Sequence, residues 1–346
     1  MPVSLFGGKK SGVRVTVFGK TDVGRTRDHN EDCFLVADLT RQLASLKPEV
    51  REHELGERGS LFVVADGMGG AAAGEVASEM ATQVIYEHML QTWCKDEDRT
   101  PQQFASRMKE AVESANGQIH RYAKDHPEMK GMGTTTTSVG ILDDQLYLAQ
   151  VGDSRAYLVR GTECVQLTKD QSLMQRLVDA GELTEEEAER SERRNIILQA
   201  LGPDERVRVD LTNQQIRRGD TIMICSDGLS GQVTREEIGT IVGQQDVELV
   251  KICSELIELA NERGGPDNIT VIVVRFSGNN LQLPESDEAV GHQVYPLTDP
   301  ESTTEPVPVY KGSPPPQPEG RAQMIVTGAV AAAVTAIALF LATVVV

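Results

Sequence analysis

The chain has 346 residues, of which 25% are charged and 39% are hydrophobic, a composition typical of a folded globular protein. Its 52 acidic residues outnumber its 34 lysines and arginines, so the formal charge is −18. Proteins that bind nucleic acid present a basic surface, and this charge therefore argues against a nucleic-acid partner.

Short β-branched and apolar runs predict strands between residues 13 and 276. They lie at 13–18, 33–37, 61–65, 134–141, 146–151, 156–159, 221–225 and 270–275. Helical periodicity predicts helices at 72–92, 102–124, 234–242 and 246–263. The polar segment 168–203 is expected to be a helical insertion between strands. Strands in hairpins together with a few long helices predict an α+β domain in which helices cover sheets.

The composition changes after residue 276. Residues 277–322 hold nine of the 15 prolines and carry seven acidic against two basic residues, which predicts an extended, solvated linker. Residues 324–346 carry no charge, and a helix of 23 residues would be about 35 Å long, enough to cross a hydrocarbon core of about 30 Å. The sequence therefore predicts a single-pass C-terminal transmembrane helix, with the domain at 13–276 on the cytoplasmic side. The alternative for this segment is a buried, alanine-rich helix.

Acidic residues recur beside glycine at the ends of predicted strands. Asp66 and Asp227 each follow an apolar run and precede a glycine, Asp267 precedes the last strand, Asp153 lies between two strands, and an acidic cluster occupies 27–32. A carboxylate at a strand end is held rigidly, and a neighbouring glycine lets other groups approach closely. Each Asp-Gly pair taken alone is also consistent with a plain turn. Together, and without a cysteine or histidine pattern, these carboxylates favour Mg²⁺ or Mn²⁺.

Six motifs in this order resemble those of the metal-dependent serine/threonine protein phosphatases of type 2C in their bacterial form. They are Arg27-x-x-Asn30-Glu31-Asp32, Asp66-Gly67-Met68-Gly69-Gly70, Met132-Gly133-Thr134-Thr135, Val151-Gly152-Asp153-Ser154-Arg155, Ser226-Asp227-Gly228 and Gly265-Pro266-Asp267-Asn268-Ile269-Thr270. The resemblance covers residues 13–276. It implies two antiparallel sheets packed face to face between helices, an αββα sandwich, and it identifies 168–203 with the flap of the family.

By this resemblance the chain would hold two Mn²⁺ or Mg²⁺ ions, a weaker third ion and the phosphate of a substrate. The matching positions are Arg27 for phosphate, Asp66 as the carboxylate that bridges two ions, Gly67 through its carbonyl, Asp227 and Asp267 as further direct ligands, Glu31 and Asp32 as acids that hold metal-bound water, and Asp153 for the third ion. The planar fork of an arginine suits bidentate contact with phosphate oxygens.

The implied activity is hydrolysis of phosphoserine and phosphothreonine in proteins by a hydroxide that bridges the two ions, acting opposite bacterial Ser/Thr kinases. Animal members have histidine where this chain has Met68, so the group that protonates the leaving alkoxide stays open. Many bacterial relatives also have histidine at the position of Gln171 in the flap.

Two alternatives to an enzyme make different predictions about these residues. A pseudophosphatase, or a metal-binding regulatory module on the same fold, predicts the loss of a metal carboxylate. A structural calcium-binding protein predicts that no phosphate-binding arginine precedes Glu31 and Asp32.

Overall fold

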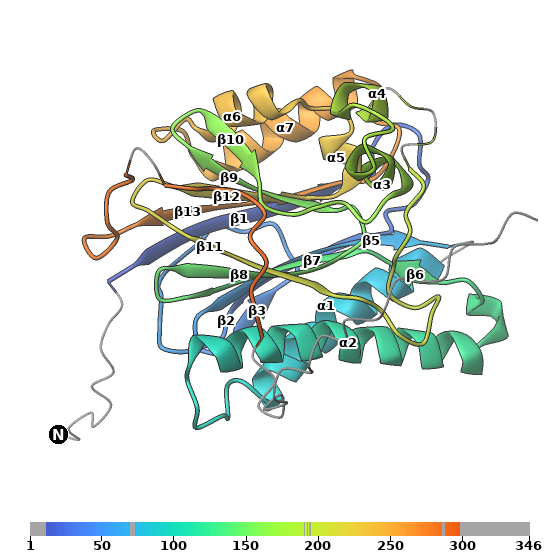
Figure 1. Cartoon of the computed structure of the whole chain (residues 1–346), viewed down its shortest axis with the longest axis horizontal. Coiled ribbons are helices and arrows are strands. Elements are labelled where there is room, and N and C mark those ends of the chain that lie inside the picture. Colours follow the sequence, from blue (N-terminus) through green and yellow to red (C-terminus); the bar gives the residue numbers. More distant parts are fainter. Residues whose placement is uncertain are drawn as a thin grey trace, which may run out of the picture. The chain divides into compact units, whose positions relative to one another are not determined.

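The computed structural model describes residues 12–69, 73–189, 191, 193, 195–285 and 288–297. These residues form a sandwich of two antiparallel sheets with helices over both outer faces (Figure 1). The predicted α+β sandwich is confirmed in this respect.

The first sheet has six strands in the order β10-β9-β12-β13-β1-β4. Their bounds are β1 Arg14–Asp22, β4 Arg51–Glu54, β9 Arg155–Arg160, β10 Glu163–Gln166, β12 Thr221–Cys225 and β13 Ile269–Ser277. Strands β1 and β13 pair along their whole length, so the two ends of the domain meet at the centre of this sheet. Helices α6 (Arg235–Val242) and α7 (Leu249–Glu262) cover its outer face (Figure 1), and the short α5 (Asp227–Ser230) follows β12.

The second sheet follows the order β11-β8-β7-β5-β2-β3, and β6 pairs with β5 outside this path. The bounds are β2 Asp32–Asp38, β3 Leu43–Ser45, β5 Ser60–Met68, β6 Gly133–Thr134, β7 Thr136–Leu142, β8 Gln145–Val151 and β11 Asp210–Gln215. Helices α1 (Ala73–Gln91) and α2 (Pro101–Asp125) cover its outer face, and the short 3₁₀ helix η1 (Pro127–Met129) follows α2. Helices α3 (Leu173–Asp179) and α4 (Glu185–Glu189) lie within segment 168–203.

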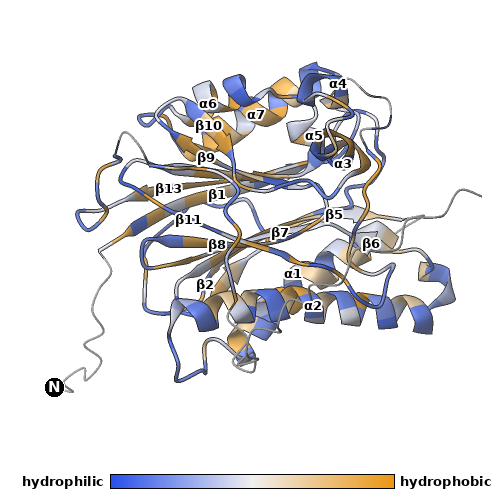
Figure 2. Cartoon of the chain, viewed as in Figure 1, coloured by the Kyte–Doolittle hydropathy of each residue, from blue (hydrophilic) through white to orange (hydrophobic). Residues whose placement is uncertain are grey.

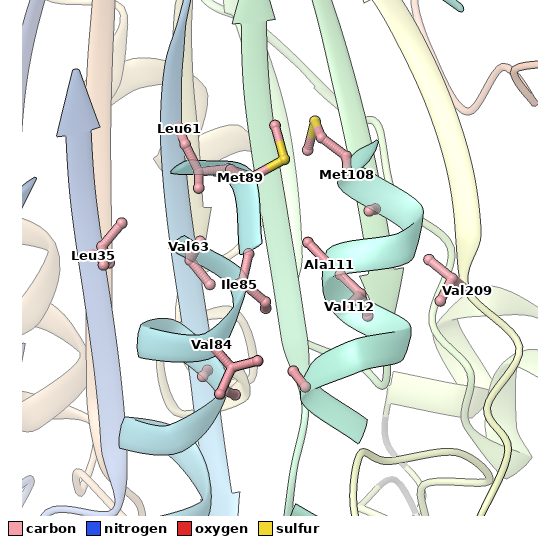
Figure 3. Packing of buried hydrophobic residues seen from close by; sticks show 14 of the residues in the cluster. Leu35, Leu61, Val63, Val84, Ile85, Met89, Met108, Ala111, Val112 and Val209 are labelled. Atoms are coloured by element: carbon pink, nitrogen blue, oxygen red, sulfur yellow. The ribbon is translucent and has the colours of Figure 1, made fainter. Parts of the chain in front are cut away.

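The central strands of both sheets are buried on both faces, which explains their nearly continuous apolar runs (Figure 2). In β5, Leu61 and Val63 pack under the helices of the second sheet, whereas Phe62 and Val64 pack between the two sheets. Figure 3 shows α1 and α2 placing Ile85 and other apolar residues against these strands. Residues of α1, α2 and β5 therefore share one core, while a separate core lies beneath α6 and α7.

The prediction of a transmembrane helix is corrected here. Among the residues that the structure describes, no helix is long and apolar enough to cross a membrane. Residues 324–346, on which that prediction was based, lie outside the described ranges. An uncharged stretch of sufficient length meets a requirement for spanning, but it does not establish a helix. We therefore withdraw the membrane anchor, and the membrane localisation with it.

The described chain continues past residue 276 and runs along the edge strand β11. The backbone N–H of Tyr295 donates to the carbonyl of Leu211 at 2.9 Å. The carboxylate of Glu288 accepts a hydrogen bond from Nε of Arg217 at 3.0 Å. The structure groups the described residues up to 297 in one compact unit. Part of the segment expected to be a linker thus packs on the domain through isolated contacts that no apolar periodicity reveals.

Candidate metal centre

A pocket of about 260 Å³ lies where strand ends and turns from both sheets meet. It brings together residues that are far apart in the sequence. Its lining consists of Arg27, Glu31, Asp66, Gly67, Met68, Gly69, Thr135, Asp153, Asn195, Ile197, Asp227 and Asp267. The lining includes every site residue predicted from the sequence except Asp32, which is buried and lies opposite Asp66 in the pairing of β2 with β5.

Asp32 and Asp66 lie opposite each other on β2 and β5; Asp32 is buried, whereas Asp66 is partly exposed to the pocket. Burial raises the pKa of Asp66 well above its usual range, and the negative charges of Asp32 and Asp227 raise it further. Burial also raises the pKa of Asp32 to about 7, although Ser226 Oγ donates a hydrogen bond of 2.7 Å to its Oδ2. Its Oδ1 is buried and has no hydrogen-bond partner among the described residues. Such mutually repelling carboxylates are stabilised by a cation.

Asp227 and Asp267 are brought together by close packing of their two turns. Asp227 is the first residue of α5, and Asp267 lies just before β13. A Cβ on Gly228 would lie 2.0 Å from the carbonyl oxygen of Asn268, so only glycine permits this approach. The side chain of Asn268 fixes the cluster at 27–32 as well, because its Oδ1 accepts a hydrogen bond of 2.8 Å from the N–H of Glu31.

Gly67 and Glu31 are packed against the beginning of α1. A Cβ on Gly67 would lie 2.2 Å from the carbonyl oxygen of Gly74, and the N–H of Gly67 donates to the carbonyl of Glu31 at 3.1 Å. A Cβ on Gly74 would lie 2.8 Å from a carboxylate oxygen of Glu31. Glu31 thus lies at the positive end of a helix. Partial burial nevertheless raises its pKa, against the opposing effect of Arg27.

Arg27 stands at the mouth of the pocket with its side chain half exposed. Its Nη2 forms an ion pair of 2.8 Å with Oδ2 of Asp267. This hydrogen bond raises the pKa of the guanidinium, which therefore stays charged. A permanent positive charge at the edge of an acidic pocket is placed where an anionic group can approach from solvent.

Asp153 occupies the turn between β8 and β9. It is buried, and burial together with the charge of Asp227 raises its pKa to about 8. The next residue, Ser154, shares a hydrogen bond of 2.8 Å with the hydroxyl of Thr135, and the N–H of Asp66 donates to that same Thr135 oxygen at 3.2 Å. A buried polar chain therefore connects the Asp153 turn to Asp66.

Sequence reasoning missed the contribution of segment 168–203 to the pocket. Asn195 and Ile197 line it, and neither belongs to a motif. Thr135 was noticed within a motif, but its position between Asp66 and Ser154 depends on the fold.

The donor set suits a hard divalent cation, because the pocket gathers carboxylate oxygens and offers no thiol or imidazole. Within the described ranges, no three His, Cys, Asp or Glu side chains already converge as a group that could hold a metal ion. Three observations therefore support the fit of this pocket to a divalent cation. They are the carboxylates that line it together, the raised pKa values among these carboxylates and the unpartnered Oδ1 of Asp32. The assignment of each ligand is a proposal, made below.

Comparison with known proteins shows the family of this chain. Residues 51–270 match the family model described as protein phosphatase 2C. The serine/threonine phosphatase stp of Listeria welshimeri is 35% identical over 255 residues, which cover 74% of this chain and 93% of that protein.

Two solved structures are similar in fold. The structure of the Mycobacterium tuberculosis serine/threonine phosphatase PstP/Ppp is 35% identical with a TM-score of 0.63, and the match covers 76% of this chain and 98% of that one. The catalytic domain of PstP in complex with two manganese ions is 34% identical with a TM-score of 0.61, and the match covers 77% and 99%. The chain belongs to the protein phosphatase 2C family and is a metal-dependent protein serine/threonine phosphatase.

Proposed function

We propose that the acidic pocket is the catalytic centre and that it removes phosphate from phosphoserine and phosphothreonine residues, opposite Ser/Thr kinases. The observation that carries this proposal is the gathering of five acidic side chains and one arginine, from distant parts of the sequence, at a single pocket of about 260 Å³, with a sixth acid, Asp32, paired opposite Asp66. The relative solved with two manganese ions supports a binuclear centre here.

In this proposal each predicted residue keeps its role. Asp66 would hold two ions at once, with the carbonyl of Gly67 on one of them. Asp227 and Asp267 would complete the direct ligands, whereas Glu31 and Asp32 would orient coordinated water. Asp153 would help to hold a weaker third ion. Bound Mn²⁺ or Mg²⁺ supplies activation of water and neutralises charge on the phosphoryl group.

The chain itself would position the substrate. The guanidinium of Arg27 would receive the phosphate at the mouth of the pocket and offset its charge. Ile197 and Asn195 place the flap beside the same pocket, where a phosphoprotein must approach. The thioether of Met68 also lines the pocket and carries no proton to give, so another group must protonate the leaving alkoxide.

Neither alternative to an enzyme agrees with the residues at the pocket. A pseudophosphatase predicts a missing carboxylate, yet each of the six acidic positions is occupied by Asp or Glu. A purely structural calcium site gives no reason for an arginine at the mouth, where Arg27 lies. Both observations support an enzyme.

The test is phosphate release from a phosphothreonine peptide by purified full-length protein with Mn²⁺. Asp66→Asn should lower kcat/KM by about 100-fold or more, because it weakens the attachment of both ions. Asp38→Asn is the matched control, because Asp38 is a buried aspartate at the opposite end of the ladder formed by β2 and β5. Wild-type turnover that survives in Asp66→Asn would refute the assignment, and a wild type without turnover would favour the pseudophosphatase.

A further inference from the structure

We propose that Gln171, at the beginning of the flap, is a positioning residue that couples the flap to the Asp153 turn. The proposal rests on the proposed function of the pocket, because it concerns how Asp153 and the flap are held there. Gln171 does not line the pocket itself.

On one side Gln171 fixes the turn that carries Asp153. Its side-chain Oε1 accepts a hydrogen bond of 3.0 Å from the N–H of Gly152, and its own N–H donates to the carbonyl of Gly152 at 2.9 Å. The backbone of Gly152 has a φ of +104°, which favours glycine. Gln171 thus contacts both polar groups of Gly152, whose carbonyl also accepts a hydrogen bond of 3.2 Å from Nε2 of Gln150, and Asp153 follows directly.

On the other side Gln171 holds the returning arm of the flap. Its carbonyl accepts a hydrogen bond of 2.7 Å from the N–H of Leu198, next to the pocket-lining Ile197. Its side-chain Nε2 donates to the carbonyl of Arg208 at 3.3 Å, just before β11. The carboxamide therefore accepts from the Asp153 turn and donates to Arg208, in the segment that joins the flap to β11, at the same time.

Asp170, the residue before Gln171, fixes the start of the flap. The guanidinium of Arg155 donates from Nε to both carboxylate oxygens of Asp170 at 3.0 Å, and from Nη2 to Oδ2 at 2.7 Å. Arg155 belongs to β9, so Asp170 anchors the start of the flap to the first sheet. Gln171 is itself buried with an exposed fraction of 8%, and a change of its side chain cannot be compensated by water without local rearrangement.

The chemistry of the side chain predicts which substitutions are tolerated. Leucine can neither accept nor donate, and so it should release both the Gly152 amide and the Arg208 carbonyl, which loosens the segment that follows the flap, while the main-chain bond to Leu198 stays. Glutamate keeps an acceptor for Gly152 but has no N–H for Arg208, so it should loosen only the segment that follows the flap. Histidine offers one acceptor and one donor nitrogen and should restore both contacts.

The experiment uses full-length protein and four variants. These are Gln171→Leu, Gln171→Glu, Gln171→His and the control Gln175→Ala. Gln175 is a glutamine of the same insertion whose side chain forms a hydrogen bond only with Asp179 among the residues that the structure describes. Hydrogen–deuterium exchange of residues 150–155 reports on the Asp153 turn. The rate of tryptic cleavage after the exposed Arg193 reports on the flap. Calorimetric titration with Mn²⁺ alone and kcat and KM for a phosphopeptide report on the site.

We expect the Gly152 amide to exchange about tenfold faster in Gln171→Leu than in the control. Cleavage after Arg193 should quicken in both Gln171→Leu and Gln171→Glu, and the weakest Mn²⁺ site should weaken most in Gln171→Leu. For a phosphopeptide, kcat should fall while KM changes less. Gln171→His should recover wild-type values.

Equal exchange and cleavage in Gln171→Leu and Gln175→Ala would overturn the proposal. If Gln171→Leu does not fold, Gln171→Glu decides the question, because unchanged cleavage after Arg193 in that variant equally contradicts the coupling. If the wild type hydrolyses no phosphopeptide, the proposed function fails, while exchange and cleavage still test the role of Gln171.

Discussion

Replacement of Arg27 by alanine should impair the use of substrate without weakening the metal centre. A charge-assisted hydrogen bond contributes about 1.5–3 kcal/mol. The Arg27 side chain is 50% exposed, so solvent screening places its contribution near the lower end, at about 1.5–2 kcal/mol. With 1.36 kcal/mol for each factor of ten, kcat/KM for a phosphothreonine peptide should fall about 10- to 30-fold.

The ion pair between Arg27 and Asp267 fixes the sign of the effect on metal binding. Removal of a positive charge 2.8 Å from the Asp267 carboxylate should leave Mn²⁺ affinity unchanged or increase it. The assay is steady-state kinetics across a Mn²⁺ titration, with Arg25→Ala as the control on the same loop. Arg27→Lys should recover part of the loss, because it keeps the charge but not the planar fork. A deficit that additional Mn²⁺ fully corrects would refute a direct contact with phosphate.

Two further predictions concern stability. Phe104→Ala should lower the free energy of unfolding in urea by about 3–5 kcal/mol, because Phe104 is fully buried with its ring 5.0 Å from that of Trp93. The control Val250→Ala, at an exposed position, should change this free energy by less than about 0.5 kcal/mol. Equal effects of the two substitutions would contradict the assigned core. A chain that ends at residue 276 should melt at least about 4 °C below one that ends at 297, because it loses the contact of Tyr295 with the Tyr147 ring at 5.3 Å and the ion pairs of Glu288. Equal melting temperatures would show that residues 277–297 do not stabilise the domain.

The elements predicted from sequence are those whose side chains are buried. The run 61–65 is apolar throughout because both faces of β5 are covered, and α1 and α2 differ from their predicted bounds by one residue at each end. The strands that were not predicted are β3, β4, β10 and β11. These four strands are short or polar, and each lies at an edge of a sheet. Positions of an edge strand that face solvent need not be apolar, so the hydrophobic pattern that predicts a strand is incomplete there.

The acidic residues of the site could be named from the sequence because each stands in a short motif with glycine. Their neighbours could not be named in the same way. Ser226 forms a hydrogen bond with Asp32, which lies 194 residues away in the sequence. Asn195 and Arg27 are also far apart in the sequence, yet both line the pocket. Contacts of this kind depend on how β2, β5 and β12 are arranged, and no local pattern encodes them.

The central claim is that this pocket works as a phosphatase only with divalent cations bound. The most direct measurement is phosphate release from a phosphothreonine peptide by chelator-stripped full-length protein as Mn²⁺ is added back, with bound Mn²⁺ counted in the same samples. We predict no turnover in the stripped protein and a rise in turnover that follows occupancy of the tight sites. Full turnover in excess chelator, or Mn²⁺ binding that brings no turnover, would contradict the claim.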